Sequence, residues 1–423
     1  MIEWIKSILL AVLVILSIGL SSVLWYATPN YAPLPDALNI NQMPEAASQY
    51  DFHDLASPRQ ITVRQTPDQQ QVLFPDQGAF TTLYKMFETT SVENVRSFNE
   101  NNENDEMVAT LPRIEISFFQ PMPIEYLHLL FSVDNNDIRK MQGMSFRKLA
   151  LAVDIEREIS YWVFDGDEDF FGEADISASK LYDVIESQRS ATVRLPVARF
   201  ISKPIRVQEL SNSIFTDPMA IRQIQEKDQS VVYTDGSRGL RVNSVQQTID
   251  FTDPTTDNRQ RDLNVQEIVD AAIAFLNRHQ SWVGDYVLAS FVIDSLENNE
   301  CTLVFQQQYE GKPIIGIDKI SNSQIRIKMK NNRVTRMNRS VSYFEEEEII
   351  KTVSVLGVDQ MKTIIERRVE QISGIRDMYI AYYPFNHGEG RVQLQPVWVV
   401  EDDHRMVAVF DAETGQEIHR VGE

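Results

Sequence analysis

The sequence predicts an α+β protein: an N-terminal membrane helix followed by three extracytoplasmic α+β domains, the last two a repeated helix plus antiparallel-sheet unit. Three observations lead to this prediction. The chain begins with a long uncharged apolar run, many later segments alternate apolar and polar residues as half-buried strands do, and one order of helix and strands occurs twice. The predicted boundaries are 1–27 for the cytoplasmic head and membrane helix, 28–58 for a Pro-rich extended tether, and 59–200, 201–345 and 346–423 for the three domains.

The run from Ile8 to Ala27 holds 20 residues without a charge. At about 1.5 Å per residue it spans roughly 30 Å, the thickness of the hydrocarbon core of a bilayer. A cleavable signal has a shorter apolar region and small residues at its cleavage site. Trp25 and Tyr26 stand where those small residues would be needed, so we interpret them as an interfacial anchor of a retained helix.

Basic residues set the expected orientation of this helix. Lys6 precedes the apolar run, and the next basic residue is Arg59. The positive-inside rule therefore places the N-terminus in the cytoplasm and residues 28–423 outside. The sequence predicts a single-pass protein of the cell membrane.

Small residues follow one face of the predicted membrane helix. At 100° per residue, Ser7, Ala11, Ser17, Ser21 and Ser22 fall within an arc of about 140°. Small residues four apart let a second membrane helix approach closely, so this face is a candidate helix-interaction surface. Serine is also tolerated near the ends of a span, and the pattern alone leaves both interpretations open.

The composition excludes several function classes. The net charge of −21 lies after residue 27 and argues against nucleic acid as a partner, because polyanions bind to patches of Lys and Arg. Cys301 is the one cysteine, which excludes an intramolecular disulfide and a cysteine-based zinc site. Its strand-like surroundings, NNECTLVFQQQ, predict a small buried hydrophobic residue.

The first outer domain is expected to alternate strands and helices. A polar loop is predicted for NENNENDE, residues 99–106. The predicted strands include RQITVRQ, RIEISFF, LALAVDI and ISYWVF, and the predicted helices are one with Phe80, Leu83, Tyr84 and Phe87 on one face, one from Ile124 to Phe131 and one from Ala178 to Ser187.

The middle domain carries the strongest local signals. Asp235-Gly236, between the apolar runs of SVVYTDGSRGLRV, predicts a hairpin with a tight primed turn, in which both residues take positive φ. Apolar residues then recur at i, i+3, i+4, i+7, i+8 and i+11 from Val265 to Leu276, which predicts an amphipathic helix. Strands follow, two of them joined at Asn331-Asn332.

The same order recurs in the last domain, where a helix precedes four strands; its apolar residues are Met361, Ile364, Ile365, Val369 and Ile372. Pro313 and Pro396 each precede a turn by 18 residues, which favours a duplicated unit. We expect EEEE, Glu345 to Glu348, to be a charged linker between the two units.

No catalytic, cofactor-binding or metal site is predicted. The sequence lacks H-E-x-x-H, G-x-S-x-G and G-x-x-x-x-G-K-[ST], the motifs of common zinc hydrolases, serine hydrolases and P-loop proteins. The acidic run from Asp165 to Asp175 fails the calcium-loop pattern, because Phe170 replaces its glycine and Ile176 its glutamate. We interpret it as a solvated turn, with weak binding of a divalent ion left open.

The chain resembles the YycH family of Gram-positive bacteria in its short basic head, its single apolar run, YTDGSRGLRV and the closing PVWVVEDDHRMVAVFDAETGQEIHR. The resemblance implies a three-domain extracytoplasmic protein that associates with a YycI-like protein and with a sensor histidine kinase of the WalK (YycG) type. In this family, signalling is attributed largely to contacts among membrane helices, and no catalytic residues come with the resemblance. The implied function is regulation of a two-component system that controls cell-wall metabolism.

A second hypothesis is a cell-surface module that binds a ligand or acts as an inhibitor. Pro396-Val397-Trp398 and the hairpin that follows resemble the sheet of PepSY-type modules. Such a module would hold a peptide or wall fragment in a groove lined by exposed aromatics such as Trp282, Tyr309 or Trp398. An enzyme is the third hypothesis, and it would need a cleft with converging titratable groups.

Overall fold

The computed structural model describes Trp4, Val14, Ser17 and residues 49–420, with gaps at 67–68, 76, 100–102, 189–191, 216, 256–263, 280, 317–322, 369–374, 389 and 403–404. Within these residues the chain forms three sheets, of 7, 9 and 6 strands. Every pairing between the described strands is antiparallel. The coarse part of the predicted α+β class, helices combined with antiparallel sheets, is confirmed, and the N-terminal membrane helix stays a prediction.

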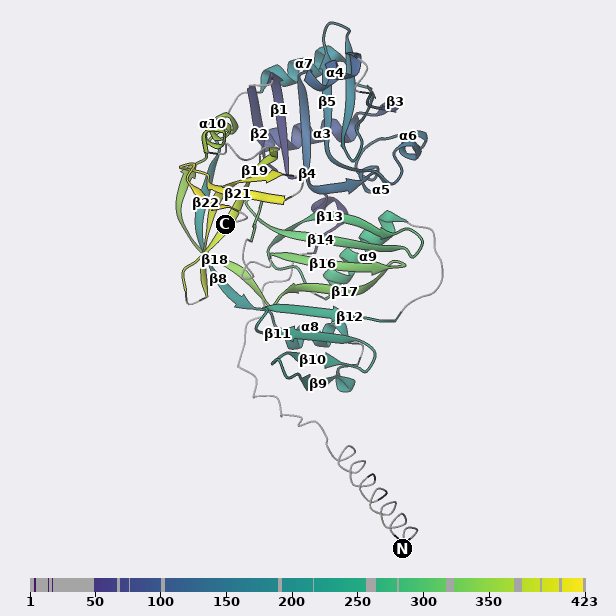
Figure 1. Ribbon diagram of the computed structural model, residues 1–423, viewed down its shortest axis with the longest axis vertical. Coiled ribbons are helices and arrows are strands. Elements are labelled where there is room, and N and C mark those ends of the chain that lie inside the picture. The colour runs from purple at the N-terminus through teal and green to yellow at the C-terminus, as the bar shows by residue number, and fades with distance from the viewer. Residues whose placement is uncertain are drawn as a thin grey trace.

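The N-terminal sheet forms one end of the molecule (Figure 1). Its core depends on apolar residues one helical turn apart, since Phe80, Leu83 and Phe87 are buried and Phe87 lies edge-on to Trp162. The strand order is β2 (Gln69–Leu73), β1 (Gln60–Thr66), β4 (Arg113–Pro123), β5 (Ser145–Asp154), β6 (Ile159–Gly166), β7 (Phe170–Ala174) and β3 (Val92–Ser97). The helices are α3 (Gly78–Thr89), α4 (Glu103–Thr110), α5 (Ile124–Leu127), α6 (Asn135–Lys140) and α7 (Ala178–Ser187).

The middle sheet carries the predicted amphipathic helix, α9 (Val265–Arg278). Asn264 caps this helix by accepting a hydrogen bond from the backbone N–H of Glu267, and the predicted apolar face is buried. The strand order is β13 (Asp285–Ser295), β14 (Glu300–Tyr309), β16 (Gln324–Lys330), β17 (Arg333–Ser340), β12 (Thr248–Thr252), β11 (Gly239–Asn243), β10 (Val231–Thr234) and β9 (Arg222–Gln225), with β15 (Lys312–Pro313) paired to β14. The other helices are α8 (Val207–Ile214) and the 3₁₀ turn η1 (Pro218–Ala220).

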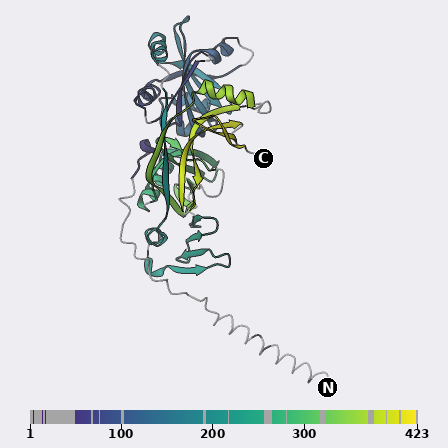
Figure 2. The same ribbon diagram turned by 90° about the vertical axis from the view of Figure 1, so that its left-hand side faces the viewer.

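The C-terminal sheet combines strands from distant parts of the chain. Its order is β18 (Ser342–Ser354), β8 (Arg194–Pro204), β20 (Arg391–Asp402), β21 (Arg405–Asp411) and β22 (Glu417–Arg420), with β19 (Ile375–Asn386) paired to β20 and with helix α10 (Val358–Arg368) before it. Strand β8, which follows the N-terminal sheet in sequence, pairs with β18 from Arg194↔Ser354 to Pro204↔Ser342. The middle sheet therefore begins and ends at neighbouring points of the C-terminal sheet. Figure 2 shows the C-terminal sheet beside the other two.

The two predicted hairpin turns have different outcomes. Asn331 and Asn332 both have positive φ and join Lys330 directly to Arg333, so this two-residue turn is confirmed. The hairpin at Asp235 also forms, but its loop holds four residues, and only Gly236 has positive φ. The predicted primed turn is wrong because the Asp235 carboxylate accepts hydrogen bonds from the backbone N–H groups of the next residues and closes a wider loop.

Two predictions of irregular backbone are wrong. Glu345–Glu348 lies within β18. There, Glu345 forms an ion pair with Lys203 of β8, and Glu348 forms one with Arg199 of the same strand. An exposed edge strand has no apolar face to reveal it in the sequence. The predicted polar loop ends earlier than expected, because α4 begins at Glu103 and its Asp105 carboxylate binds the Arg96 guanidinium.

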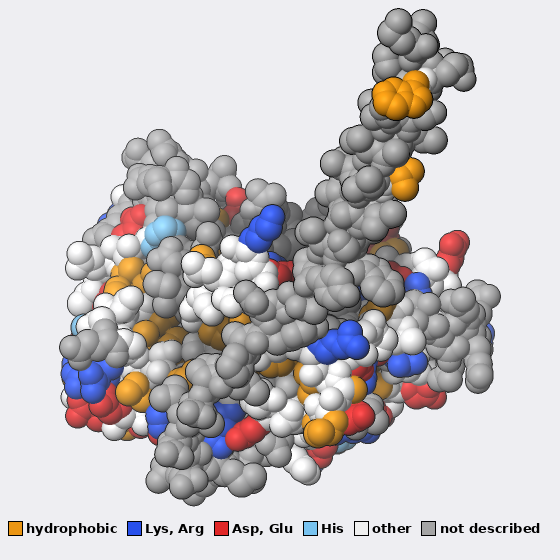
Figure 3. Space-filling view, turned by 90° about the horizontal axis from the view of Figure 1, so that it is seen from below, with side chains coloured by type: hydrophobic (Ala, Val, Ile, Leu, Met, Phe, Trp, Pro, Cys, Tyr) orange, Lys and Arg blue, Asp and Glu red, His pale blue; other side chains and the backbone are white. Residues whose placement is uncertain are grey.

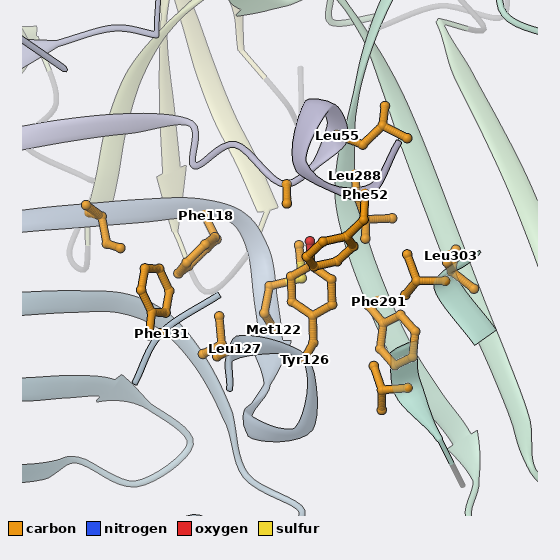
Figure 4. Packing of buried hydrophobic residues seen from close by; sticks show 14 of the residues in the cluster. Phe52, Leu55, Phe118, Met122, Tyr126, Leu127, Phe131, Leu288, Phe291 and Leu303 are labelled. Carbon is orange, nitrogen blue, oxygen red and sulfur yellow. The ribbon is translucent and has the colours of Figure 1, made fainter. Parts of the chain in front are cut away.

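An apolar contact joins the N-terminal and middle sheets (Figure 4). Tyr126 of α5 stacks on Phe291 of β13 with ring centroids 5.9 Å apart. Phe52, in the short helix α2 (Phe52–Leu55), lies 5.8 Å from Tyr126 in an edge-to-face arrangement. All three rings are buried, so the residues that lead into the first sheet also seal it against the second.

On the face of the molecule seen from below, charged side chains are spread rather than gathered (Figure 3). Viewed from below, the described residues show basic, acidic and hydrophobic side chains side by side on this face (Figure 3). This face therefore mixes charges of both signs, as expected for a solvated exterior.

Replacing Phe291 by alanine is expected to lower the free energy of unfolding by about 3–5 kcal/mol, because it leaves a cavity beside Tyr126. Urea unfolding of the purified protein measures this change. The matched control is Leu296→Ala, since Leu296 is 57% exposed, and its effect should stay within about 0.5 kcal/mol. Equal effects of the two substitutions would show that the contact does not hold the sheets together.

Candidate functional site

The N-terminal and C-terminal sheets meet through charged side chains that are buried. Charged residues in apolar strands are costly unless they are paired, so their positions indicate a specific contact. We call this set the junction ion network: Arg59, Glu115, Arg147, Lys148, Asp377 and Glu401. Three cations face three carboxylates, which leaves the network without net charge.

Arg59, immediately before β1, lies at the centre of this network. Its guanidinium binds the Asp377 carboxylate, lies 3.8 Å from Glu401 Oε2, and stacks 3.9 Å above the ring of Tyr379. The Arg59 side chain is only 2% exposed. One residue of the first sheet is thus held by β19 and β20 of the third.

The second half of the network comes from β4 and β5. Arg147 binds the Glu401 carboxylate, which also accepts a hydrogen bond of 2.9 Å from the Tyr379 hydroxyl. Lys148 Nζ lies 3.2 Å from Glu115 Oε1 and 4.0 Å from Asp377 Oδ1. Each carboxylate of the network therefore has a cation of the N-terminal sheet beside it.

The network shifts the pKa values of its members. Burial alone would raise the pKa of Asp377, but the positive charges of Arg59, Lys148 and Arg147 hold it below its usual range. Burial alone would raise the pKa of Glu115 as well, but nearby cations hold it below its usual value, and Lys148 has the largest effect among them. Both carboxylates stay charged at neutral pH.

A cavity of about 510 Å³ adjoins the network where the three sheets meet. Phe119 of β4, Ser290 of β13 and Gln306 of β14 line it, together with Tyr379 and Glu401. Gln306 is buried and donates hydrogen bonds to the Ile314 carbonyl and to Ser323 Oγ. The cavity is part polar and part apolar, and a group bound in it would contact all three sheets.

The described residues that precede β1 pack beside the middle sheet. Tyr50 donates from its backbone N–H to Asn277 Oδ1 at 3.2 Å, and its carbonyl accepts from Asn277 Nδ2 at 2.8 Å. Its ring meets Trp282 edge-on at 5.1 Å, and Trp282 Nε1 donates to the same Asn277 oxygen. Residues 50–55, the last part of the predicted tether, thus pack against α9 and the middle sheet.

The predicted membrane-helix residues Ser7, Ala11, Ser21 and Ser22 and the predicted anchor residues Trp25 and Tyr26 lie outside the described residues. Ser17 is described, and it is helical and exposed. Among the helices of the described residues, none combines the length and the apolar character that crossing a membrane requires. The helix-interaction face stays a prediction.

Two aromatics of the ligand-groove hypothesis are core residues. Trp282 and Trp398 are each 1% exposed. Tyr309 is partly buried between Phe200 and Tyr382, each 5.0 Å away between ring centroids. The expected row of exposed aromatic rings is therefore absent at these three positions.

The remaining chemical predictions concern single groups. Cys301 is fully buried as predicted, and burial raises the pKa of its thiol to about 12. In the acidic run, Asp167 accepts from the backbone of Ser145, and Asp169 from that of Gly166. In the part of the chain that the structure describes, no three His, Cys, Asp or Glu side chains gather as a metal site would require.

The sequence analysis missed the junction ion network. Its signal was present as single charges inside apolar strands, such as Glu115 between two buried isoleucines. A charge in such a place needs a buried partner. The partners Arg59 and Asp377 are 318 residues apart, so no local pattern could name them.

Three antiparallel sheets with a buried polar junction define a multidomain α+β protein whose most elaborate site is an interdomain contact. Two family models cover nearly the whole chain: the YycH protein, N-terminal domain, at residues 3–190, and the YycH protein, C-terminal domain, at residues 189–414. The chain belongs to the YycH family, a family of membrane-anchored extracellular regulatory proteins.

One solved structure agrees with this fold. The crystal structure of YycH from Bacillus subtilis matches with a TM-score of 0.59 and 12% identity, over 86% of this chain and 98% of that chain. An uncharacterized protein from Eubacterium rectale ATCC 33656 matches with a TM-score of 0.39 and 11% identity, over 53% of this chain and 86% of that chain. The Bacillus megaterium YpeB C-terminal domain matches with a TM-score of 0.29 and 14% identity, over 51% of this chain and 96% of that chain. A search of curated proteins found no match.

Replacing Asp377 by asparagine is expected to lower the free energy of unfolding by about 3–5 kcal/mol, because Arg59 then stays buried without its main counter-charge. Urea unfolding of the purified protein at neutral pH gives the value. Glu297→Gln removes one exposed carboxylate away from the network and is the matched control. A loss no larger than that of the control would contradict a structural role for the network.

Stability is also expected to fall on acidification. The pKa values of Asp377 and Glu115 are lower in the folded protein than their usual values of 3.8 and 4.5, so the unfolded chain takes up protons first. The stabilisation by these carboxylates is complete above about pH 5 and is lost as the pH falls through 4.5 and 3.8 toward the folded pKa values. The urea midpoint measured from neutral to acid pH should decline less steeply in Glu115→Gln than in the native protein. Parallel declines would argue against the proposed charge pairing.

Proposed function

We propose that this protein is a membrane-anchored extracytoplasmic regulator of a WalK-type sensor histidine kinase, acting together with a YycI-like protein. Membership of the YycH family over residues 3–414 is the observation that carries this proposal. The apolar run from Ile8 to Ala27 supports it, since the run is long enough for a retained span. In this proposal residues 28–423 lie outside the cell as three domains, and tune signalling that maintains the cell wall.

Contacts among membrane helices are the proposed route of regulation. The face formed by Ser7, Ala11, Ser17, Ser21 and Ser22 would pack against a span of the kinase or of the YycI-like protein. A coupling free energy of about 1–3 kcal/mol between this packing and the kinase state changes output several-fold. That amount is within the range of one helix–helix contact.

The docking of Tyr50 supports a role for the outer part. Its hydrogen bonds to Asn277 tie the end of the tether to α9, close to the junction of the first two sheets. A fixed tether end passes a rotation of the folded part to the span more directly than a loose one. The sheets would thus bias the orientation of the membrane helix.

Replacing Ser17, Ser21 and Ser22 together by leucine is expected to weaken co-purification of the kinase and to change kinase-dependent transcription several-fold, because bulky side chains keep the helices apart. The measurements are reporter transcription and pull-down of the kinase from solubilised membranes. The control is Val12→Leu with Val23→Leu, which enlarges side chains on the opposite helix face. Unchanged association and output in the triple variant would exclude this face as the contact.

A further inference from the structure

A second cavity of about 510 Å³ lies within the middle sheet, away from the domain junction. It is bounded by α9, by the end of α8, by the loop between β10 and β11 and by the turn between β16 and β17. These elements belong to one sheet and its helices, so the cavity does not depend on how the sheets are arranged. The proposed kinase regulation makes no use of it.

The walls of this cavity are basic, although the whole chain is strongly acidic. Arg238, Arg278 and Arg333 line it, with the carboxylate of Asp253 among the lining residues and that of Asp235 paired with Arg238. Asp253 Oδ2 lies 3.5 Å from the Arg333 guanidinium, which is half exposed. Arg278 is exposed and forms no hydrogen bond or ion pair with the residues that the structure describes. Three arginines against two carboxylates leave one uncompensated positive charge at this concave site, in a protein with a net charge of −21.

The YTDGSRGL segment holds one of these arginines in place. Asp235 Oδ2 accepts from Arg238 Nε at 3.0 Å and from Arg238 Nη2 at 2.7 Å, while Arg238 Nη1 donates to the Ile214 carbonyl at 3.0 Å. Asp235 Oδ1 meanwhile closes the loop through the backbone N–H groups of Ser237 and Arg238. The four-residue loop thus fixes a guanidinium in the cavity wall, which a two-residue turn would not do.

Aromatic side chains form the other wall. Phe251 and Phe275 lie 5.6 Å apart between ring centroids, and His279 meets Phe275 edge-on at 4.5 Å. The Ser213 hydroxyl donates to the Leu210 carbonyl, so His279 Nδ1 donates to Ser213 Oγ. Burial, with the charge of Arg278, lowers the pKa of His279 to about 4, so the ring is neutral and packs as an aromatic surface.

We propose that this cavity binds a small organic anion with a flat ring, an aryl phosphate or aryl carboxylate, whose acid group lies against Arg278 and Arg333 and whose ring lies against Phe275. Guanidinium groups bind phosphate and carboxylate oxygens in pairs of parallel hydrogen bonds. The adjacent rings supply apolar area for the remainder of the ligand. This inference goes beyond the proposed kinase regulation and does not rest on it.

Isothermal titration calorimetry of the purified full-length protein with phenylphosphate tests the proposal. Saturable binding is expected, and Arg278→Gln with Arg333→Gln should weaken it at least about tenfold, because two charge-assisted contacts are lost. Both side chains are exposed, so the melting curve should not change. Arg139→Gln, an exposed arginine of α6, is the matched control and should bind as the native protein does.

Three further titrations separate the parts of the site. Phe275→Ala should weaken phenylphosphate but leave inorganic phosphate unchanged, and benzyltrimethylammonium, which has a ring but the opposite charge, should not bind. No saturable binding of phenylphosphate up to about 10 mM would overturn the proposal, as would equal affinity in the double arginine variant. Equal affinities for phenylphosphate and inorganic phosphate would overturn the assignment of a ring-binding wall.

Discussion

The pairing of β8 with β18 is the constraint on which the arrangement of the three sheets depends. Because Pro204 lies opposite Ser342, the middle sheet leaves and rejoins the C-terminal sheet at one point. Strand β8 is also paired with the beginning of β20, whose far end carries Glu401 of the junction ion network. Any rotation of the middle sheet therefore acts on the strand that holds the N-terminal sheet in place.

The N-terminal sheet is held to the other two by contacts of different kinds. Its contact with the middle sheet is apolar, through Tyr126 and Phe291, and apolar packing tolerates small sliding movements. Its contact with the C-terminal sheet is ionic, through Arg59 and Asp377. A buried ion pair offsets its desolvation only in a narrow geometry, so this second contact defines the angle between the sheets.

Sequence reasoning succeeded where the determining interactions are local. The apolar spacing of α9 and the Asn331-Asn332 turn were predicted correctly because neighbouring residues decide both. The place of β8 and the strand at Glu345–Glu348 were missed, since each depends on a partner more than a hundred residues away. The turn type at Asp235 was predicted wrongly for another reason. The Asp235 side chain accepts backbone hydrogen bonds that stabilise a wider loop than the backbone preference predicted. The ion network was missed because its partners are distant in the sequence and because charged residues interrupt the apolar pattern of the strands that carry them.

The C-terminal end of α9 contacts both Tyr50 and the basic cavity. Asn277 binds the end of the tether through Tyr50, and the next residue, Arg278, lines the basic cavity. His279, which follows, is fixed by Ser213 of α8 and packs on Phe275. A ligand affects a distant site only as far as its affinity differs between two arrangements of the elements that join them. Here the joining element is a single helical turn, so a shift of its backbone on binding of an anion at Arg278 would reach Asn277 directly. This coupling would need no rotation of one sheet against another, because Tyr50 is bound by the residue next to Arg278.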